Sequence, residues 1–156
     1  VDECQVESDL ELLLPATYVT GSSERMLLYR ELDSLTLDKD VEDFRTRLID
    51  RFGPIPSETE ELLRIVPLRR LAARLGAEKV FLKGGRMSLF FVSNPDSPYY
   101  QSQAFGKVIA YMMKYTRRCD LREQNTRRSM LVKDVKNVET AVSVLQEIVA
   151  MQVEEG

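Results

Sequence analysis

The sequence predicts an α+β fold in which N-terminal strands and helices are followed by two β-β-α units, antiparallel hairpins with helices on one face. Its 156 residues suffice for one domain, with possible subdomains at residues 1–76 (mainly helical) and 77–156. Apolar residues make up 44% of the chain and charged residues 30%, as in globular proteins rather than disordered ones. Apolar residues recur at helical spacing over most of residues 1–76. In residues 77–156, stretches with helical spacing alternate with paired strands.

The first segment, residues 4–14, alternates partly between apolar and polar side chains and stops at Pro15. This pattern indicates one or two strands that end in a turn. A helix then begins at Ser22 or Ser23, either of which can cap it, and extends to about Ser34.

The clearest helix begins at Asp38 and ends before Gly53, a residue typical of helix ends. Its opposite face, away from the apolar stripe, bears Asp43, Arg47 and Asp50. These side chains can contact a partner, although a solvated helix face with internal pairing is the more common reason for such a trio.

The remaining elements follow in order. Ser57 opens a helix that we expect to kink or break near Val66, because Pro67 cannot donate a backbone hydrogen bond. A second segment extends to Gly76. Paired strands and helices then alternate, with strands at 80–82 and 87–92, a helix at 101–115, strands at 119–123 and 130–133, and a helix from Asn137.

Catalytic chemistry is strongly limited by composition. The chain has no histidine, which excludes an imidazole base, an imidazole metal ligand and a histidine triad. Gly106-Lys107 lacks the spacing of a phosphate-binding loop, and Cys4 and Cys119 are too far apart in sequence for a zinc knuckle. We therefore expect no catalytic residue, cofactor or metal in this chain, and two free thiols, with one disulfide between Cys4 and Cys119 as the less favoured alternative. Its longest apolar stretch, Val108–Met113, is far shorter than a membrane span.

Charge is unevenly distributed along the chain. Residues 61–136 hold 16 basic and 6 acidic side chains, whereas residues 1–60 hold 6 basic and 15 acidic ones. One interpretation is a nucleic-acid contact through the central arginines; the other, which we favour, is mutual neutralisation of two halves. The arginines concerned are Arg117, Arg118, Arg122, Arg127 and Arg128.

Two motifs make the chain recognisable. They are LIDRFGPIP at residues 48–56 and LRRLAARLG at residues 68–76, and ERMLLYREL at residues 24–32 supports them. With these motifs the chain resembles the C-terminal domain of bacterial transcription-repair coupling factors, over residues 10–92. The resemblance implies a fragment of a large multidomain protein in the bacterial cytoplasm. That protein is an ATP-driven DNA translocase, with ATP and Mg bound upstream, which displaces stalled RNA polymerase and recruits UvrA for nucleotide excision repair.

The resemblance also implies a role for the domain itself. In the family it is a non-catalytic regulatory domain that packs on a UvrB-like module of the same protein, masks the UvrA-binding surface and restrains the motor. Asp50 and Arg51 match the family motif, so we expect the interdomain contact at Asp43, Arg47, Asp50 and Arg51. Family members often carry an acidic residue at the position of Arg47, and this departure alters the polarity of the contact.

Overall fold

The computed structural model describes residues 3–153 and divides the chain into two compact units. The sheet unit contains the residues up to 10 and those from 68 onward, and the helical unit contains residues 11–67. This division differs from a boundary at residue 76, because strand β1 (Gln5–Ser8) belongs to the sheet and most of helix α4 (Ile65–Arg74) belongs with it.

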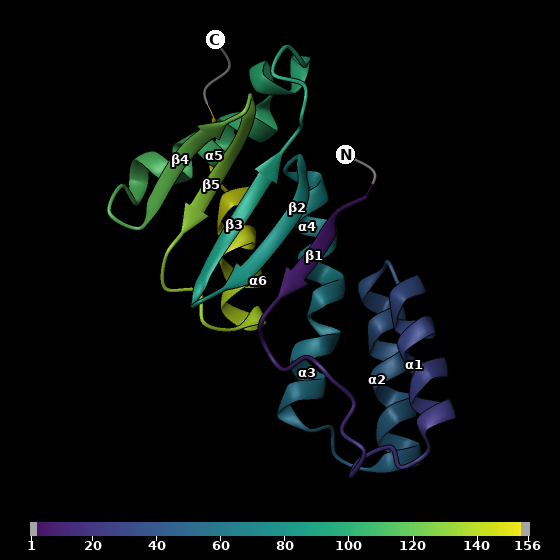
Figure 1. Cartoon of the computed structure of the whole chain (residues 1–156). Helices are drawn as coiled ribbons and strands as arrows, with labels where there is room; N and C mark the ends of the chain where they lie inside the picture. The colour runs from purple at the N-terminus through teal and green to yellow at the C-terminus, as the bar shows by residue number, and fades with distance from the viewer. Residues whose placement is uncertain (1–2, 154–156) are drawn as a thin grey trace. The chain divides into compact units, whose positions relative to one another are not determined.

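The sheet unit is built on five strands in the order β1-β2-β3-β5-β4 (Figure 1). β1 lies parallel to β2 (Ala77–Lys83), while β3 (Arg86–Phe91), β4 (Cys119–Gln124) and β5 (Arg127–Val132) extend the sheet in antiparallel pairs. The predicted hairpins β2-β3 and β4-β5 both form. They join through β3 and β5, which makes a single mixed sheet and confirms the α+β class.

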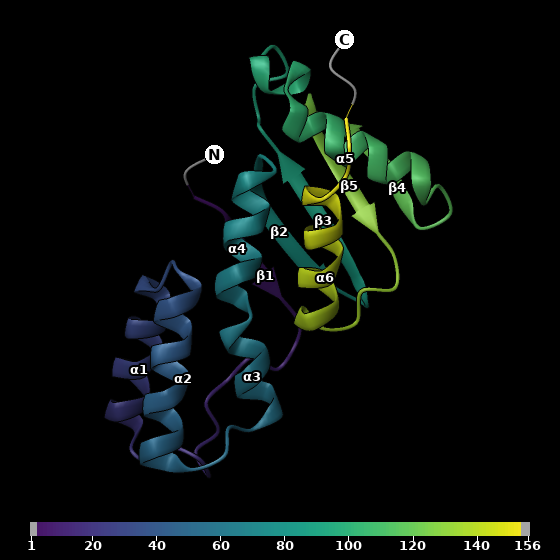
Figure 2. The ribbon, with the colours of Figure 1, turned by 180° about the vertical axis from the view of Figure 1, so that it is seen from behind.

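Helices cover one face of this sheet. Figure 2 shows α4, α5 (Gln103–Lys114) and α6 (Val138–Val149) in front of the strands, with a short 3-10 turn, η1 (Pro98–Gln101), before α5. Alternate strand residues point toward these helices and are buried, because successive side chains of a strand face opposite sides. These buried residues are Val80, Leu82, Met87, Leu89, Met130 and Val132. The prediction of helices on one face is confirmed.

Tight turns close both hairpins. Gly84 and Gly85 have φ of +63° and +72°, and Asn125 and Thr126 take up the corresponding left-handed conformation with φ of +52° and +65°. Positive φ at two successive residues matches the right-handed twist of the flanking strands, which explains the short connections.

The helical unit packs α1 (Ser22–Ser34), α2 (Asp38–Phe52) and α3 (Ser57–Leu63) around one apolar core. The chain before α1 is held on these helices by hydrogen bonds. The Leu14 amide donates to the Tyr29 hydroxyl at 2.7 Å, and the Thr59 hydroxyl donates to the Leu13 carbonyl at 2.8 Å. Of the one or two strands expected in residues 4–14, one forms, β1, whereas Leu13 and Leu14 bond to helix side chains instead.

The break between α3 and α4 falls at Arg64 and not beside Pro67. Pro67 lies in the first turn of α4, where the backbone N–H groups have no acceptor within the helix. The proline is therefore accommodated without a kink, and the position predicted for the break is wrong by two or three residues.

Candidate interdomain surface on helix α2

The four residues predicted for the interdomain contact lie on helix α2 and are exposed. Asp43, Arg47, Asp50 and Arg51 are all exposed, whereas the apolar stripe is buried, with Phe44 only 1% exposed. Asp38 and Asp40 in the first turn complement the helix dipole, and the Gly53 amide closes the last turn onto the Ile49 carbonyl.

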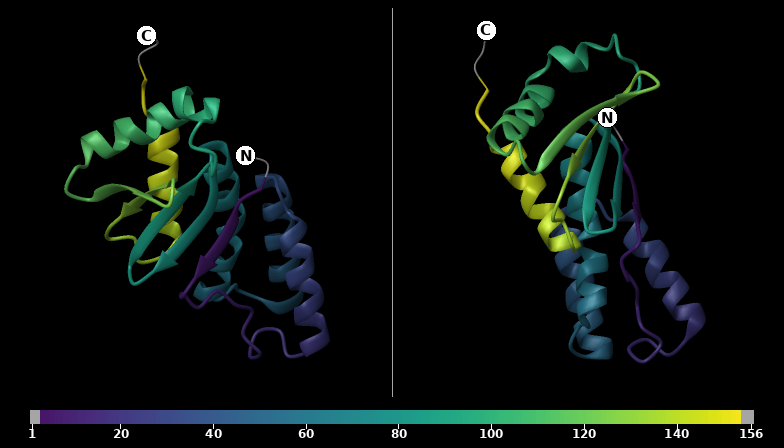
Figure 3. Two further views of the ribbon diagram at one scale, coloured as in Figure 1. Left: turned by 45° about the horizontal axis from the view of Figure 1, so that its top comes forward. Right: turned by 60° about the vertical axis from the view of Figure 1, so that its left-hand side comes forward.

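Three of the four residues surround a groove of about 360 Å³ between α1 and α2, helices that lie side by side in the left-hand view of Figure 3. Its floor is apolar and its rim is charged. The lining residues are Leu28, Glu31, Phe44, Arg47, Leu48, Asp50, Arg51 and Phe52. Asp43 does not line the groove, although its negative charge acts on Arg47 one helical turn later and contributes to the raised pKa of that guanidinium.

Two ion pairs connect the groove's arginines to α1. Arg47 pairs with Glu31 and Arg51 pairs with Glu24. The Arg51 guanidinium also lies 4.9 Å from the centre of the Phe52 ring. Both arginines are thus paired within the helical unit while their side chains remain more than half exposed to a partner.

Asp50 differs from its neighbours. Within residues 3–153, its carboxylate makes no hydrogen bond or ion pair, and the side chain is exposed at the rim of the groove. An unpaired carboxylate beside an apolar floor can accept a charge-assisted hydrogen bond from a cation on another surface.

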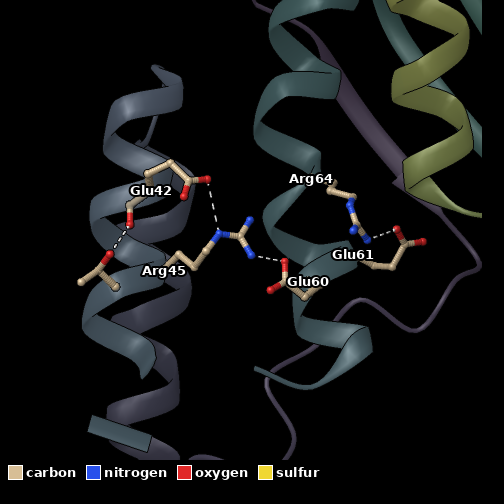
Figure 4. Close-up of polar contacts among 6 residues, drawn as sticks. Glu42, Arg45, Glu60, Glu61 and Arg64 are labelled. Carbon is tan, nitrogen blue, oxygen red and sulfur yellow. Dashed lines mark hydrogen bonds and ion pairs between the residues drawn. The ribbon is translucent and has the colours of Figure 1, made fainter. Parts of the chain in front are cut away.

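A second contact fixes α2 from the other side. Figure 4 shows Arg45 between Glu42 of its own helix and Glu60 of α3. Sequence reasoning identified neither this contact nor Glu24 and Glu31. The only feature of the sequence that could have indicated these ion pairs is the presence of opposite charges on neighbouring predicted helices. That feature does not determine which residues pair.

The five central arginines do not form one free basic patch. Arg118 donates to the Lys133 carbonyl at 2.9 Å and the Asp134 carbonyl at 3.2 Å, bracing the turn after β5. Three others have acidic partners: Arg122 lies near Asp120, Arg127 contacts Glu78, and Arg128 lies near Glu123 and over the Tyr100 ring. Arg117 is exposed in the turn before β4. Three of the five arginines thus have acidic partners, but these partners all lie within residues 61–136, so the contacts are not the neutralisation between two halves of the chain that we favoured.

The part of the chain that the structure describes contains no cluster of three or more histidine, cysteine or acidic side chains able to hold a metal ion. No helix between residues 3 and 153 combines the length and apolar character required to traverse a bilayer.

Both cysteines are free thiols and buried, Cys4 in the sheet unit's N-terminal segment and Cys119 in β4. Burial raises the pKa of each thiol from 9.0 to about 11. The fraction of reactive thiolate near pH 8 is consequently about a hundredfold smaller in the folded chain.

We expect iodoacetamide at about pH 8 to alkylate the folded chain at least tenfold more slowly than the urea-unfolded chain. Unfolded thiols lose their protons near pH 9 and folded ones near 11, so the free energy of unfolding should also fall as pH rises across this interval. Mass spectrometry measures the alkylation rates, and urea titrations at about pH 8 and about pH 11 measure the change in the free energy of unfolding. Equal alkylation rates in both states would contradict the burial of the thiols.

The comparison with protein-family models decides the family. The model of the TRCF domain matches residues 8–102, more than half of the chain. The chain belongs to the TRCF domain family. The matched segment of this TRCF domain includes the whole helical unit and the hairpin β2-β3.

Curated relatives carry the corresponding name. The TRCF domain is 28% identical over 138 residues to the transcription-repair-coupling factor of Rickettsia prowazekii, covering 87% of this chain and 12% of the relative. It is 29% identical over 116 residues to that of Rickettsia bellii (74% and 10%), and 32% identical over 78 residues to that of Escherichia coli (50% and 7%). The chain therefore spans about a tenth of the length of these relatives.

A solved structure shows that the whole fold is shared. The crystal structure of the C-terminal domain of a transcription-repair coupling factor matches with a TM-score of 0.68 at 17% identity, covering 96% of this chain and 95% of that one. The resemblance stated from the sequence motifs is confirmed.

Proposed function

We propose that this TRCF domain is a regulatory, non-catalytic part of a transcription-repair coupling factor and docks on the UvrB-like module of the same protein. In the docked state it masks the UvrA-binding surface and restrains an ATP-dependent motor. The motor, with its own ATP and Mg, translocates on DNA, displaces stalled RNA polymerase and leads to nucleotide excision repair in the bacterial cytoplasm. The relatives' shared name supports this setting.

The observation that carries the proposal is the unpaired Asp50 carboxylate at the groove on α2. A basic side chain of the partner can pair with Asp50 while an apolar side chain enters the groove over Phe44 and Leu48. Arg47 and Arg51 are already held by Glu31 and Glu24, so little side-chain entropy is lost when the surfaces meet.

Arg47 makes this surface more positive than it is in family members with an acidic residue at the same position. Its charge is balanced by Glu31, and that of Arg51 by Glu24, which leaves Asp50 as the uncompensated charge at the groove. The partner's contact is therefore expected to depend on a single carboxylate. A docking free energy of about 2.7 kcal/mol would keep the undocked form near 1%.

The test is Asp50→Lys, with Asp43→Lys as the matched control on the same helix but outside the groove. We expect Asp50→Lys to weaken binding of the domain to the separately purified UvrB-like module at least tenfold, equivalent to about 1.4 kcal/mol. Asp43→Lys should change the dissociation constant by less than about twofold, since exposed charges outside a contact contribute little.

The same pair of variants in the full-length protein reports on regulation. Asp50→Lys should raise both UvrA binding and ATPase activity in the absence of polymerase, because the undocked form becomes more populated. If the two substitutions have equal effects, or if neither has one, the groove on α2 is not the docking surface.

A further inference from the structure

The second face of the sheet is open. Helices of the sheet unit lie behind the strands in Figure 1, and no helix among the described residues of this unit lies in front of β2 or β3. The face is not uniformly polar, since Phe81 of β2 and Phe90 of β3 project from it and remain partly exposed. Phe91, next in sequence, points the other way and is fully buried.

The two open-face rings are close neighbours. Phe81 lies opposite Ser88 and Phe90 lies opposite Lys79, which makes the rings a diagonal pair on adjacent strands. Lys79 links them, because its ammonium lies 5.4 Å from the Phe81 ring centre and 6.0 Å from that of Phe90. On the far side, the Arg127 guanidinium lies 5.7 Å from the Phe90 ring centre.

Positive charge borders these rings. Lys79 and Arg127 have acidic partners, Glu7 and Glu78. Lys83 and Arg86 continue the same face to the end of the hairpin, where they lie directly opposite each other. Both are exposed, and within residues 3–153 neither forms an ion pair, although the Asp9 carboxylate lies in the same turn and accepts a hydrogen bond from the Gly84 amide at 3.0 Å. Two like charges in register weaken a hairpin unless something else uses them.

We propose that this open face, defined by Lys79, Phe81, Lys83, Arg86, Phe90 and Arg127, binds single-stranded nucleic acid. Bases stack on Phe81 and Phe90, and phosphates contact Lys83 and Arg86 at the hairpin end. Aromatic rings interleaved with cations on a sheet are the combination used for sequence-tolerant recognition of single strands. The site differs from a contact through the central arginine block, from which it takes only Arg127.

The cations over the rings do not prevent stacking. A cation–π contact at an exposed site is weaker than the stacking of a base on an aromatic side chain. Lys79 and Arg127 have long flexible side chains, so each can move from its ring to an adjacent phosphate as a base takes its place. Ser88 and Ser129, which flank the rings on the same face, are too small to obstruct a base.

The geometry favours a single strand over a duplex. Strands lie about 4.8 Å apart, so five strands form a surface roughly 20 Å wide. The DNA major groove is about 12 Å wide and admits a helix or a two-stranded ribbon, which this sheet exceeds. An acidic peptide would use the cations but would have no need of two exposed rings.

The experiment titrates the 156-residue chain with a fluorescently labelled oligothymidylate of about 12 nucleotides at low salt, within the site size of a single sheet domain. A duplex of equal length and polyglutamate serve as competitors. We expect the single strand to bind at least tenfold more tightly than the duplex. The double variant Phe81→Leu/Phe90→Leu, which keeps apolar volume, should lose about tenfold in affinity through the lost stacking.

Charge variants separate stacking from simple attraction. Lys83→Gln/Arg86→Gln should weaken binding and reduce the slope of log affinity against log salt by about 1.4, as expected for two lost phosphate contacts. Lys114→Gln, a substitution on α5 at the helical side of the sheet, is the matched control and should leave affinity unchanged. If the leucine variant is unfolded by circular dichroism, Ser88→Glu replaces it, which repels phosphates without altering an apolar side chain.

Several results would overturn the proposal: no binding at low salt, equal affinity for duplex and single strand, or full displacement by polyglutamate with no effect of the leucine or glutamate variant. The outcome is independent of the docking proposal, because Asp50→Lys lies in the helical unit and leaves the open face intact.

Discussion

Replacement of Phe44 by alanine is expected to lower the free energy of unfolding of the helical unit by about 3–5 kcal/mol. Phe44 is 1% exposed and lies in the core formed with Leu28, Leu48 and Leu63. Removing its ring forfeits the transfer free energy of the side chain and leaves a cavity beneath the groove on α2. Because small domains are stable by only about 5–15 kcal/mol, this loss is a large share of the total.

Urea unfolding monitored by circular dichroism measures the effect. Ile49→Ala on the same helix is the matched control, since Ile49 is 46% exposed and should cost only about 0.5–1 kcal/mol. Both substitutions alter helix propensity in the same direction, so their difference isolates burial. A Phe44 variant that unfolds at the same urea concentration as the Ile49 variant would contradict the packing described for this core.

Gly76→Ala is expected to destabilise the sheet unit by roughly 2–5 kcal/mol, through backbone strain and a steric clash together. Gly76 has φ of +84°, and a Cβ placed there would overlap with a ring carbon of Tyr99. The ring cannot move away without cost, because its hydroxyl donates to the Leu75 carbonyl and its face packs on Phe91.

Gly84→Ala separates the two causes. Gly84 also has positive φ, at +63°, but nothing lies within 4 Å of the added methyl group. It should therefore report the backbone cost alone, about 1–2 kcal/mol. Thermal unfolding of both variants gives the difference that belongs to Tyr99. If the two alanines cost the same, the close approach of Tyr99 to the backbone is not maintained in solution.

Local signals in the sequence predicted most elements because their causes are local. The stripe at Val41, Phe44 and Leu48 with Gly53 behind it is sufficient to define α2, and the glycine pair at 84–85 is sufficient for the first hairpin. Pro67 led to a wrong position for the helix break, since a proline in a first helical turn and one that breaks a helix have the same sequence pattern. The pairing of β1 with β2 depends on residues 5–8 meeting residues 79–82, which no local pattern specifies.

The candidate surface was predictable to the same extent. Helical periodicity alone predicts that Asp50 is exposed, and Asp50 is exposed in the structure. The pairing of Arg47 with Glu31 and of Arg51 with Glu24 depends on how α1 lies beside α2, a tertiary relation that the spacing of one helix does not contain. Asp43 lies on the exposed face of α2 as predicted, and the groove itself, which Asp43 does not line, depends on the position of α1 and could not be predicted from α2 alone.

The parallel pairing of β1 with β2 has a consequence for the order of folding. The hairpins β2-β3 and β4-β5 join residues that are near in sequence, whereas β1 reaches β2 only after the intervening residues 11–67 have been brought into a closed loop. Loop closure costs entropy before any hydrogen bond of the strand compensates for it. Although β1 precedes the other four strands of this sheet in the sequence, it is thus expected to be the last of them to enter the sheet, and with only four residues it should be the first to detach under tension.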